Sequence, residues 1–98
     1  MKKMLIHRFS GNHETKVYRH FNLYGETWCV CHSAARVFFH DKQKMNKNFI
    51  LSNYKTGMSV GRMDYRTSIE ALREGRKILL RNGKSKILKL LKRLKVIN

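Results

Sequence analysis

The stretch TSIEALREGRKILLRNG, residues 67–83, predicts a helix that decides the class of fold. Thr67 is a good N-cap residue, and Glu70, three residues later, completes a capping box. Asn82 and Gly83 form a stop signal of the left-handed type. The apolar residues fall on one arc of this helix: Ile69, Ala71, Leu72, Gly75, Ile78 and Leu79. We therefore expect this arc to pack against the rest of the fold.

The stretch that follows, KSKILKLLKRLKVIN at 84–98, predicts a second amphipathic helix with six Lys or Arg and no acid. One helix on a small sheet leaves apolar surface uncovered, and a neighbouring helix is the economical cover. We expect the apolar side to pack on the core, with a homodimer interface or a free arm as alternatives. That side consists of Ile87, Leu90, Leu91, Leu94 and Ile97. The basic side consists of Lys86, Lys89, Lys92 and Arg93.

The chain before residue 67 is predicted to be rich in strands, because apolar and polar residues alternate between glycine-containing turns. Strands are expected at 3–9, 16–24, 27–32, 36–40, 49–54 and 58–63, the last two joined by a KTG turn. Residues 11–15 and 25–26 are interpreted as turns, and 41–48 as a lysine-rich loop. The predicted fold is α+β, a small antiparallel sheet of three to five strands packed by one long helix and a C-terminal basic amphipathic helix. We expect a single domain over 1–98, β-rich over 1–66 and helical over 67–98.

The charge balance is the strongest functional signal. The chain has 22 Lys or Arg against six Asp or Glu, a formal charge of +16 at pH 7. A compact domain with such an excess repels itself unless a polyanion neutralises it, and nucleic acid is the commonest polyanion. Acidic protein surfaces and anionic lipids are the alternatives, but the tail carries no Trp or Phe to anchor in a membrane.

The same sequence predicts a cytoplasmic protein with no membrane partner. No stretch approaches the roughly 20 apolar residues of a membrane span. The apolar run near the start is too short for a secretion signal. Two cysteines do not make a disulfide framework, which favours a reducing compartment.

Basic residues interleaved with aromatic ones supply the candidate binding residues, because bases stack on rings and phosphates are neutralised by cations. The predicted phosphate contacts are Arg19, Arg36, Lys55, Arg62, Arg66, Arg73, Lys77, Lys86, Lys89, Lys92 and Arg93. The predicted stacking residues are Tyr18, Tyr54 and Tyr65, each close to a basic residue, with a place in the core as the alternative. Trp28, Phe21 and Phe49 are expected in the core.

The motif WCVCH at 28–32 does not predict a metal site. Zinc usually takes two separated ligand pairs, and on a strand His32 would point away from Cys29 and Cys31. We expect two small buried residues behind Trp28 and Val30, with no metal and no cofactor. The chain also lacks a phosphate-cradling glycine loop, and its one close carboxylate pair, Glu70 and Glu74, suits a helix surface. We therefore expect a protein that is not an enzyme.

Residues 49–81 resemble a known layout. A hairpin ending in Gly61, then Thr67, then Glu70 and Ala71 opening a helix, is similar to the three strands and one helix of AP2-type and phage-integrase arm-binding domains. This resemblance implies a sheet that lies in the DNA major groove.

The chain also resembles, in style, the small accessory proteins of phages and mobile elements, which include anti-CRISPR proteins. The shared features are the TG hairpin and a helix opening in T-x-x-E-A, which is T-S-I-E-A here. The function expected is a small basic phage-type accessory protein that binds DNA or RNA mainly through phosphate contacts. The alternative is an anti-defence inhibitor, of anti-CRISPR type, that blocks a host nuclease or nucleoprotein complex.

Overall fold

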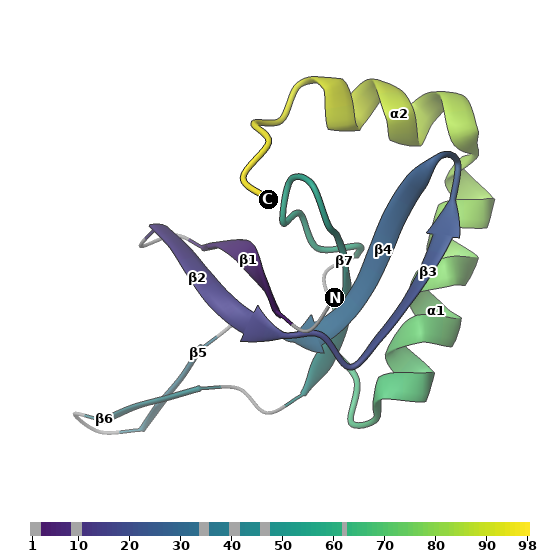
Figure 1. Ribbon diagram of the computed structural model, residues 1–98. Helices are drawn as coiled ribbons and strands as arrows, with labels where there is room; N and C mark the ends of the chain where they lie inside the picture. The colour runs from purple at the N-terminus through teal and green to yellow at the C-terminus, as the bar shows by residue number, and fades with distance from the viewer. Residues whose placement is uncertain (1–2, 9–10, 34–35, 40–41, 46–47, 62) are drawn as a thin grey trace.

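The computed structural model describes residues 3–8, 11–33, 36–39, 42–45, 48–61 and 63–98. The strands in these residues are β1 (Lys3–Arg8), β2 (Gly11–Lys16), β3 (Arg19–Leu23), β4 (Glu26–His32), β5 (Arg36–Phe39), β6 (Lys42–Met45) and β7 (Phe49–Asn53). The helices are α1 (Ser68–Asn82) and α2 (Lys84–Lys92). All strand pairs are antiparallel, in the orders β1-β2, β3-β4-β7 and β5-β6 (Figure 1). The predicted α+β class is confirmed.

A tight turn sets the register of the central sheet. Tyr24 and Gly25 both have positive φ angles, 59° and 72°, as a two-residue turn of type I′ requires. The turn therefore lies one residue earlier than the predicted 25–26. It places Phe21 opposite Trp28 and Arg19 opposite Val30.

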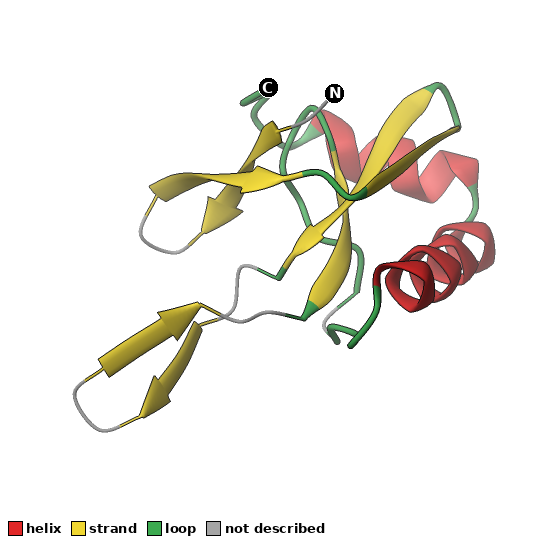
Figure 2. Cartoon of the chain, turned by 60° about the horizontal axis from the view of Figure 1, so that its bottom comes forward, coloured by secondary structure: helices red, strands yellow, loops and turns green. Residues whose placement is uncertain are grey.

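The central strand β4 is buried on both faces, and each face belongs to a different core. Trp28 and Val30 join Leu51 in the core beneath the helices. Cys29 and Cys31 face the other way, into a second core. That core also contains Met4 and Ile6 of β1, Val17 after β2, and Ile50 of β7. Figure 2 shows the helices on one side of the central sheet and the β1–β2 hairpin on the other. The predicted burial of Trp28 and both cysteines is confirmed.

Helix α1 begins and ends as its sequence predicts. The side-chain oxygen of Thr67 accepts a hydrogen bond from Glu70 N at 3.2 Å. Gly83 ends the helix with a φ of 85°, and its N–H donates to Leu79 O at 3.1 Å. Between these ends Gly75 lies directly on β7: a Cβ at Gly75 would come 2.6 Å from Leu51 Cβ. The glycine allows the helix to approach the sheet closely.

Helix α2 packs on the core through Ile87 and Leu91, which are 6% and 8% exposed. The prediction that Leu90 and Leu94 are packed beside them is wrong, because these side chains are 45% and 38% exposed. The apolar stripe is wider than the surface it covers, so its margin is left in solvent. After α2 the chain returns to the sheet, where Ile97 N donates to Lys55 O at 2.7 Å. The tail is therefore part of the fold and not a free arm.

Three predicted segments are wrong in the structure. Residues 11–15, expected as a turn, lie in β2, because pairing with β1 outweighs their turn-forming composition. The expected loop 41–48 contains β6. In the expected strand 58–63, residue 62 lies outside the described residues, and the others form only a single bridge, Ser52 to Ser59, because Gly61 has a φ angle of 79° that an extended strand cannot continue through.

Candidate nucleic-acid interface

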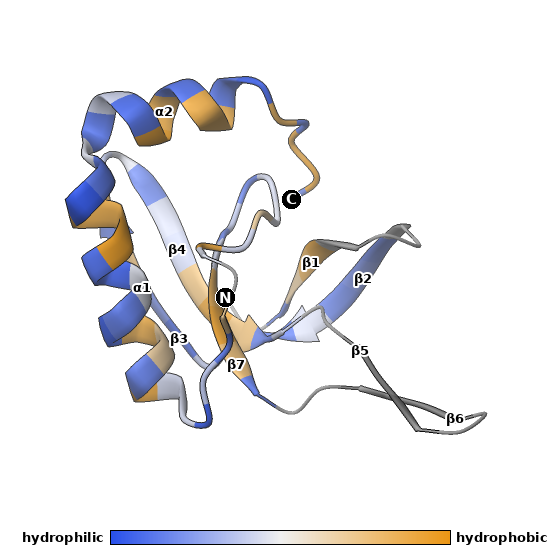
Figure 3. Cartoon of the chain, turned by 180° about the vertical axis from the view of Figure 1, so that it is seen from behind, coloured by the Kyte–Doolittle hydropathy of each residue, from blue (hydrophilic) through white to orange (hydrophobic). Residues whose placement is uncertain are grey.

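The helical part of the chain concentrates the positive charge. Residues 67–98 hold ten Lys or Arg and two Glu, so one third of the chain carries +8 of the total +16. In Figure 3 the outer sides of α1 and α2 are largely hydrophilic, with hydrophobic residues turned toward the sheet. Two shallow grooves on these helices bring the cations together.

The first groove, called here the α1 groove, has a volume of about 360 Å³. It is lined by Ile69, Leu72, Arg73, Arg76, Lys77 and Leu80. These residues recur every three or four positions, which places them on one stripe of the helix. Lys77 Nζ lies 3.2 Å from Glu74 Oε1, so part of its charge is already neutralised. Arg73 and Arg76 form no ion pair with any described residue.

The second groove, called the α2 groove, has a volume of about 620 Å³ and is almost purely cationic. It is lined by Lys84, Ser85, Lys86, Leu88, Lys89 and Lys92. Its lining holds no carboxylate, and none of its four lysines forms an ion pair with a described residue. Lys84 and Lys86 also lie at the N-terminus of α2, the positive end of the helix dipole, where a cation costs about 0.3–1 kcal/mol. Helix stability therefore does not account for these lysines.

The structure brings together about half of the predicted cations. Arg73 and Lys77 line the α1 groove, and Lys86, Lys89 and Lys92 line the α2 groove. Arg93, at the end of α2, and Arg66, ahead of α1, are both exposed.

The remaining predicted cations lie apart from the two grooves. Arg19 Nε donates to Ser68 Oγ at 3.0 Å, at the start of α1. Lys55, in the turn after β7, pairs with Glu26 at 3.5 Å. Arg62 lies outside the described residues, as does the side chain of Arg36.

The three predicted stacking tyrosines have different environments. Tyr54 packs against the core that contains Cys29 and Cys31. Tyr65 packs against the core beneath the helices and forms a bridge with Phe49. Only Tyr18 of the three is classed as exposed, at 39%. Phe21 and Phe49, predicted as core residues, are partly buried against the helix-side core.

Four basic residues of the helical part were not predicted as phosphate contacts. Arg76 lines the α1 groove and Lys84 the α2 groove, while Arg81 and Lys95 are exposed nearby in the chain. Helical spacing could have found Arg76, which lies three residues after Arg73. Lys84 directly follows the helix stop at Gly83, so helical spacing from α1 does not reach it.

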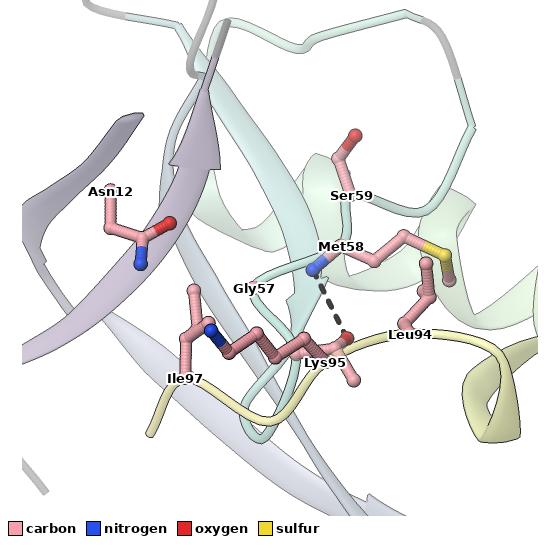
Figure 4. A pocket seen from close by; sticks show the side chains of 8 residues that line it. Asn12, Gly57, Met58, Ser59, Leu94, Lys95 and Ile97 are labelled. Carbon is pink, nitrogen blue, oxygen red and sulfur yellow. Dashed lines mark hydrogen bonds between the residues drawn. The ribbon is translucent and has the colours of Figure 1, made fainter. Parts of the chain in front are cut away.

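A separate pocket of about 460 Å³ lies between the C-terminal tail and the turn after β7 (Figure 4). Asn12, Thr56, Gly57, Met58, Ser59, Leu94, Lys95 and Ile97 line it. Figure 4 shows Met58 N donating to Thr56 Oγ1, a bond of 3.3 Å that shapes the turn. The lining offers no carboxylate, histidine or cysteine, and its polar side chains are those of Asn12, Thr56, Ser59 and Lys95.

The cysteines are chemically quiet. Burial raises the pKa of Cys29 from 9.0 to about 11, with a smaller contribution from Cys31, and burial also raises the pKa of Cys31. Both thiols therefore stay protonated at neutral pH, and a protonated thiol is a poor nucleophile and metal ligand. Within the described part of the chain, no three His, Cys, Asp or Glu side chains gather as a metal would need.

The described residues contain no helix with the length and apolar character needed to cross a membrane. Comparisons with models of protein families, with curated protein sequences and with solved structures find no match to this chain.

Proposed function

We propose that the chain is a small basic protein of phage type that binds nucleic acid, DNA or RNA, mainly through phosphate contacts from the outer faces of α1 and α2. The observation that carries the proposal is the α2 groove. Four lysines line one short helix, with no carboxylate among them and two of them at the unfavourable end of the helix dipole. A row of phosphates is the ligand that would relieve this repulsion.

The helices are better candidates for this contact than the central sheet. One face of the central sheet carries Cys29, Cys31 and Ile50 and is covered by Met4 and Ile6 of β1. The helices cover the other face. The side chains of β4 and β7 are thus largely engaged within the protein, and only the edge strand β3 among the three presents exposed side chains to solvent along its length. The helix faces combine exposure with charge, and phosphate contacts require little more than these.

The proposal is of a binding protein without catalytic activity, acting in the cytoplasm. The proposal that the protein lacks catalytic activity is supported by the chemistry of the described side chains. The grooves are lined mainly by cations and aliphatic residues, and both thiols are protonated at neutral pH. Cys29 and Cys31, both within the described residues, are not joined in a disulfide, and this supports a reducing compartment.

The test is a titration of labelled duplex DNA and duplex RNA at several salt concentrations, followed by fluorescence anisotropy. If four to six phosphates are neutralised, log affinity should fall with log salt at a slope of roughly −4 to −5. Lys89→Glu should weaken binding to both duplexes and make the slope shallower. Lys3→Glu is the control, because it makes the same charge change at an exposed residue of β1, although it also breaks the exposed ion pair between Lys3 and Glu14. Equal effects of the two variants would show that net charge, and not the α2 groove, is responsible.

The alternative is an anti-defence inhibitor that binds a host nuclease or nucleoprotein complex. It is favoured by Leu80, Leu90 and Val96, which are exposed beside the cations. Apolar side chains add nothing to phosphate binding but contribute to protein interfaces, including a homodimer through α2. No binding of either duplex at low salt with micromolar protein would reject the first proposal and favour this one. Light scattering would then separate a homodimer from a monomer.

A further inference from the structure

Three aromatic rings gather at the end of the central sheet. Tyr18 lies between β2 and β3, His32 ends β4, and Phe49 begins β7. The Tyr18 ring meets His32 and Phe49 edge to face, each at 5.0 Å between centroids. His32 stacks on Phe49 at 4.8 Å and 26°. These three residues are called the Tyr18 cluster.

Hydrogen bonds hold the exposed ring in place. Tyr18 OH lies 2.8 Å from His32 Nε2, and His32 Nδ1 lies 3.4 Å from Asn48 O. A histidine with its proton on Nδ1 satisfies both contacts, since Tyr18 then donates to Nε2. The Tyr18 ring is thus positioned before any ligand arrives, although 39% of the residue is exposed. A preorganised ring loses little conformational entropy when a second ring stacks on it.

Charges beside the ring suit a nucleotide. Lys16 Nζ lies 5.2 Å from the centroid of the Tyr18 ring, within the range of a cation–π contact. Lys16 and His20 are both exposed. Asp64 is a negative charge connected to this site through Asn48: its carboxylate accepts a hydrogen bond from Asn48 Nδ2 at 3.0 Å, and this neutral donor leaves the charge in place. A lysine next to an exposed tyrosine can hold the phosphate that flanks a stacked base.

We propose that the Tyr18 cluster is a binding site for an unpaired base of nucleic acid, with Tyr18 as the stacking residue and Lys16 as the contact to the flanking phosphate. The inference rests on the proposed function and narrows its ligand. In a blunt duplex the faces of all bases except the outer faces of the two terminal pairs are covered by their neighbours, so a single strand, a loop or an overhang offers Tyr18 far more exposed base faces. The protein should therefore gain affinity from unpaired nucleotides beyond what its charge supplies.

The test compares two substitutions that differ in the aromatic ring. Tyr18→Phe keeps the ring and loses only the hydrogen bond to His32 Nε2. Tyr18→Leu keeps much of the side-chain volume and loses the ring. A labelled oligothymidine of about 12 nucleotides and a blunt duplex of the same length are titrated with each variant. We expect Tyr18→Leu to bind the single strand about ten-fold or more weakly and the duplex as the wild type does. Tyr18→Phe should bind both nearly as well as the wild type.

Two results would overturn this inference and leave the proposed function intact. In the first, Tyr18→Leu binds the single strand as the wild type does. In the second, it weakens single-strand and duplex binding equally. If wild-type protein binds neither ligand at low salt, the proposed function fails, and this inference fails with it. If Lys89→Glu weakens duplex binding and Tyr18→Leu has no effect on either ligand, the proposed function holds and this inference is rejected.

A second measurement does not depend on how the variants fold. Wild-type protein is irradiated with the same strand carrying one 5-iodouracil, and the adduct is located by mass spectrometry. The expected result is a crosslink on Tyr18. Adducts found only on other residues would contradict the site.

Discussion

The side chain of Asn98 pairs with the backbone of Leu5, a residue 93 positions earlier in the chain. Leu5 N donates to Asn98 Oδ1 and Asn98 Nδ2 donates to Leu5 O, each at 2.7 Å. The same Nδ2 lies 2.6 Å from Tyr54 O. One amide thus occupies the place of a strand residue beside β1 and joins β1 to the turn after β7.

Replacing this amide should loosen the tail from the sheet. Asn98→Asp keeps an acceptor for Leu5 N but places a carboxylate against the carbonyl oxygens of Leu5 and Tyr54. We expect the free energy of unfolding to fall by about 1–3 kcal/mol, measured by urea titration. Asn12→Asp, the same change at an exposed position of β2, is the control and should have little effect. Equal stability of the two variants would show that the Asn98 bonds contribute nothing.

The neighbours Leu90 and Leu91 provide a test of how α2 packs. Leu91 is 8% exposed and belongs to the helix-side core, whereas Leu90 is 45% exposed. Leu91→Asp buries an unpaired charge and should cost several kcal/mol of stability. Leu90→Asp should cost less than about 1 kcal/mol, since its side chain already meets water. Thermal melting of both variants measures the difference. Similar losses of stability would contradict the packing in which Leu91 is buried and Leu90 is exposed.

Sequence predicted those features of the fold that depend on local chemistry. Thr67 and Gly83 bound α1 because a cap and a left-handed glycine act on their own turn of helix. The alternation in β4 predicted two buried cysteines behind Trp28 and Val30, because strand periodicity is two. That the two faces belong to separate cores was not predicted. The basic stripe of α2 follows from the same reasoning at helical spacing.

Features that depend on distant partners were not predictable in this way. Residues 11–15 have the composition of a turn and become β2 only by pairing with β1. Strict alternation along 16–24 would put Val17 on the same face as Phe21, but Val17 packs in the opposite core because the chain leaves the strand at 17–18. Asn98 gave no signal, since its partners lie more than 40 residues away in sequence. For the tyrosines, sequence placed each beside basic residues, but only tertiary packing distinguishes exposed Tyr18 from Tyr54 and Tyr65.

Gly75 should tolerate no side chain. A glycine in a helix is normally improved by alanine, by up to about 1 kcal/mol. Here the added Cβ would lie 2.6 Å from Leu51 Cβ and 2.7 Å from Leu51 Cδ2, which requires the helix or β7 to move. We expect Gly75→Ala to destabilise the protein by about 1–3 kcal/mol in urea titration. Arg76→Ala, on the exposed side of the same turn, is the control, and an increase in stability for Gly75→Ala would contradict this close packing.

The two buried thiols should make stability depend on pH in the alkaline range. The folded protein holds the pKa of Cys29 at about 11, above its ordinary value of 9.0, because burial disfavours the thiolate. The unfolded chain therefore loses this proton first, so the stability that the thiol contributes is complete below pH 9 and is lost as pH rises through about 11. Near pH 10.5 the loss should reach roughly 2 kcal/mol from Cys29 alone. Urea titrations of wild type and of Cys29→Ala at about pH 8 and pH 10.5 isolate this effect, since lysine titration is common to both proteins. A wild-type loss no larger than that of the variant would mean that the Cys29 thiolate is tolerated in the folded state.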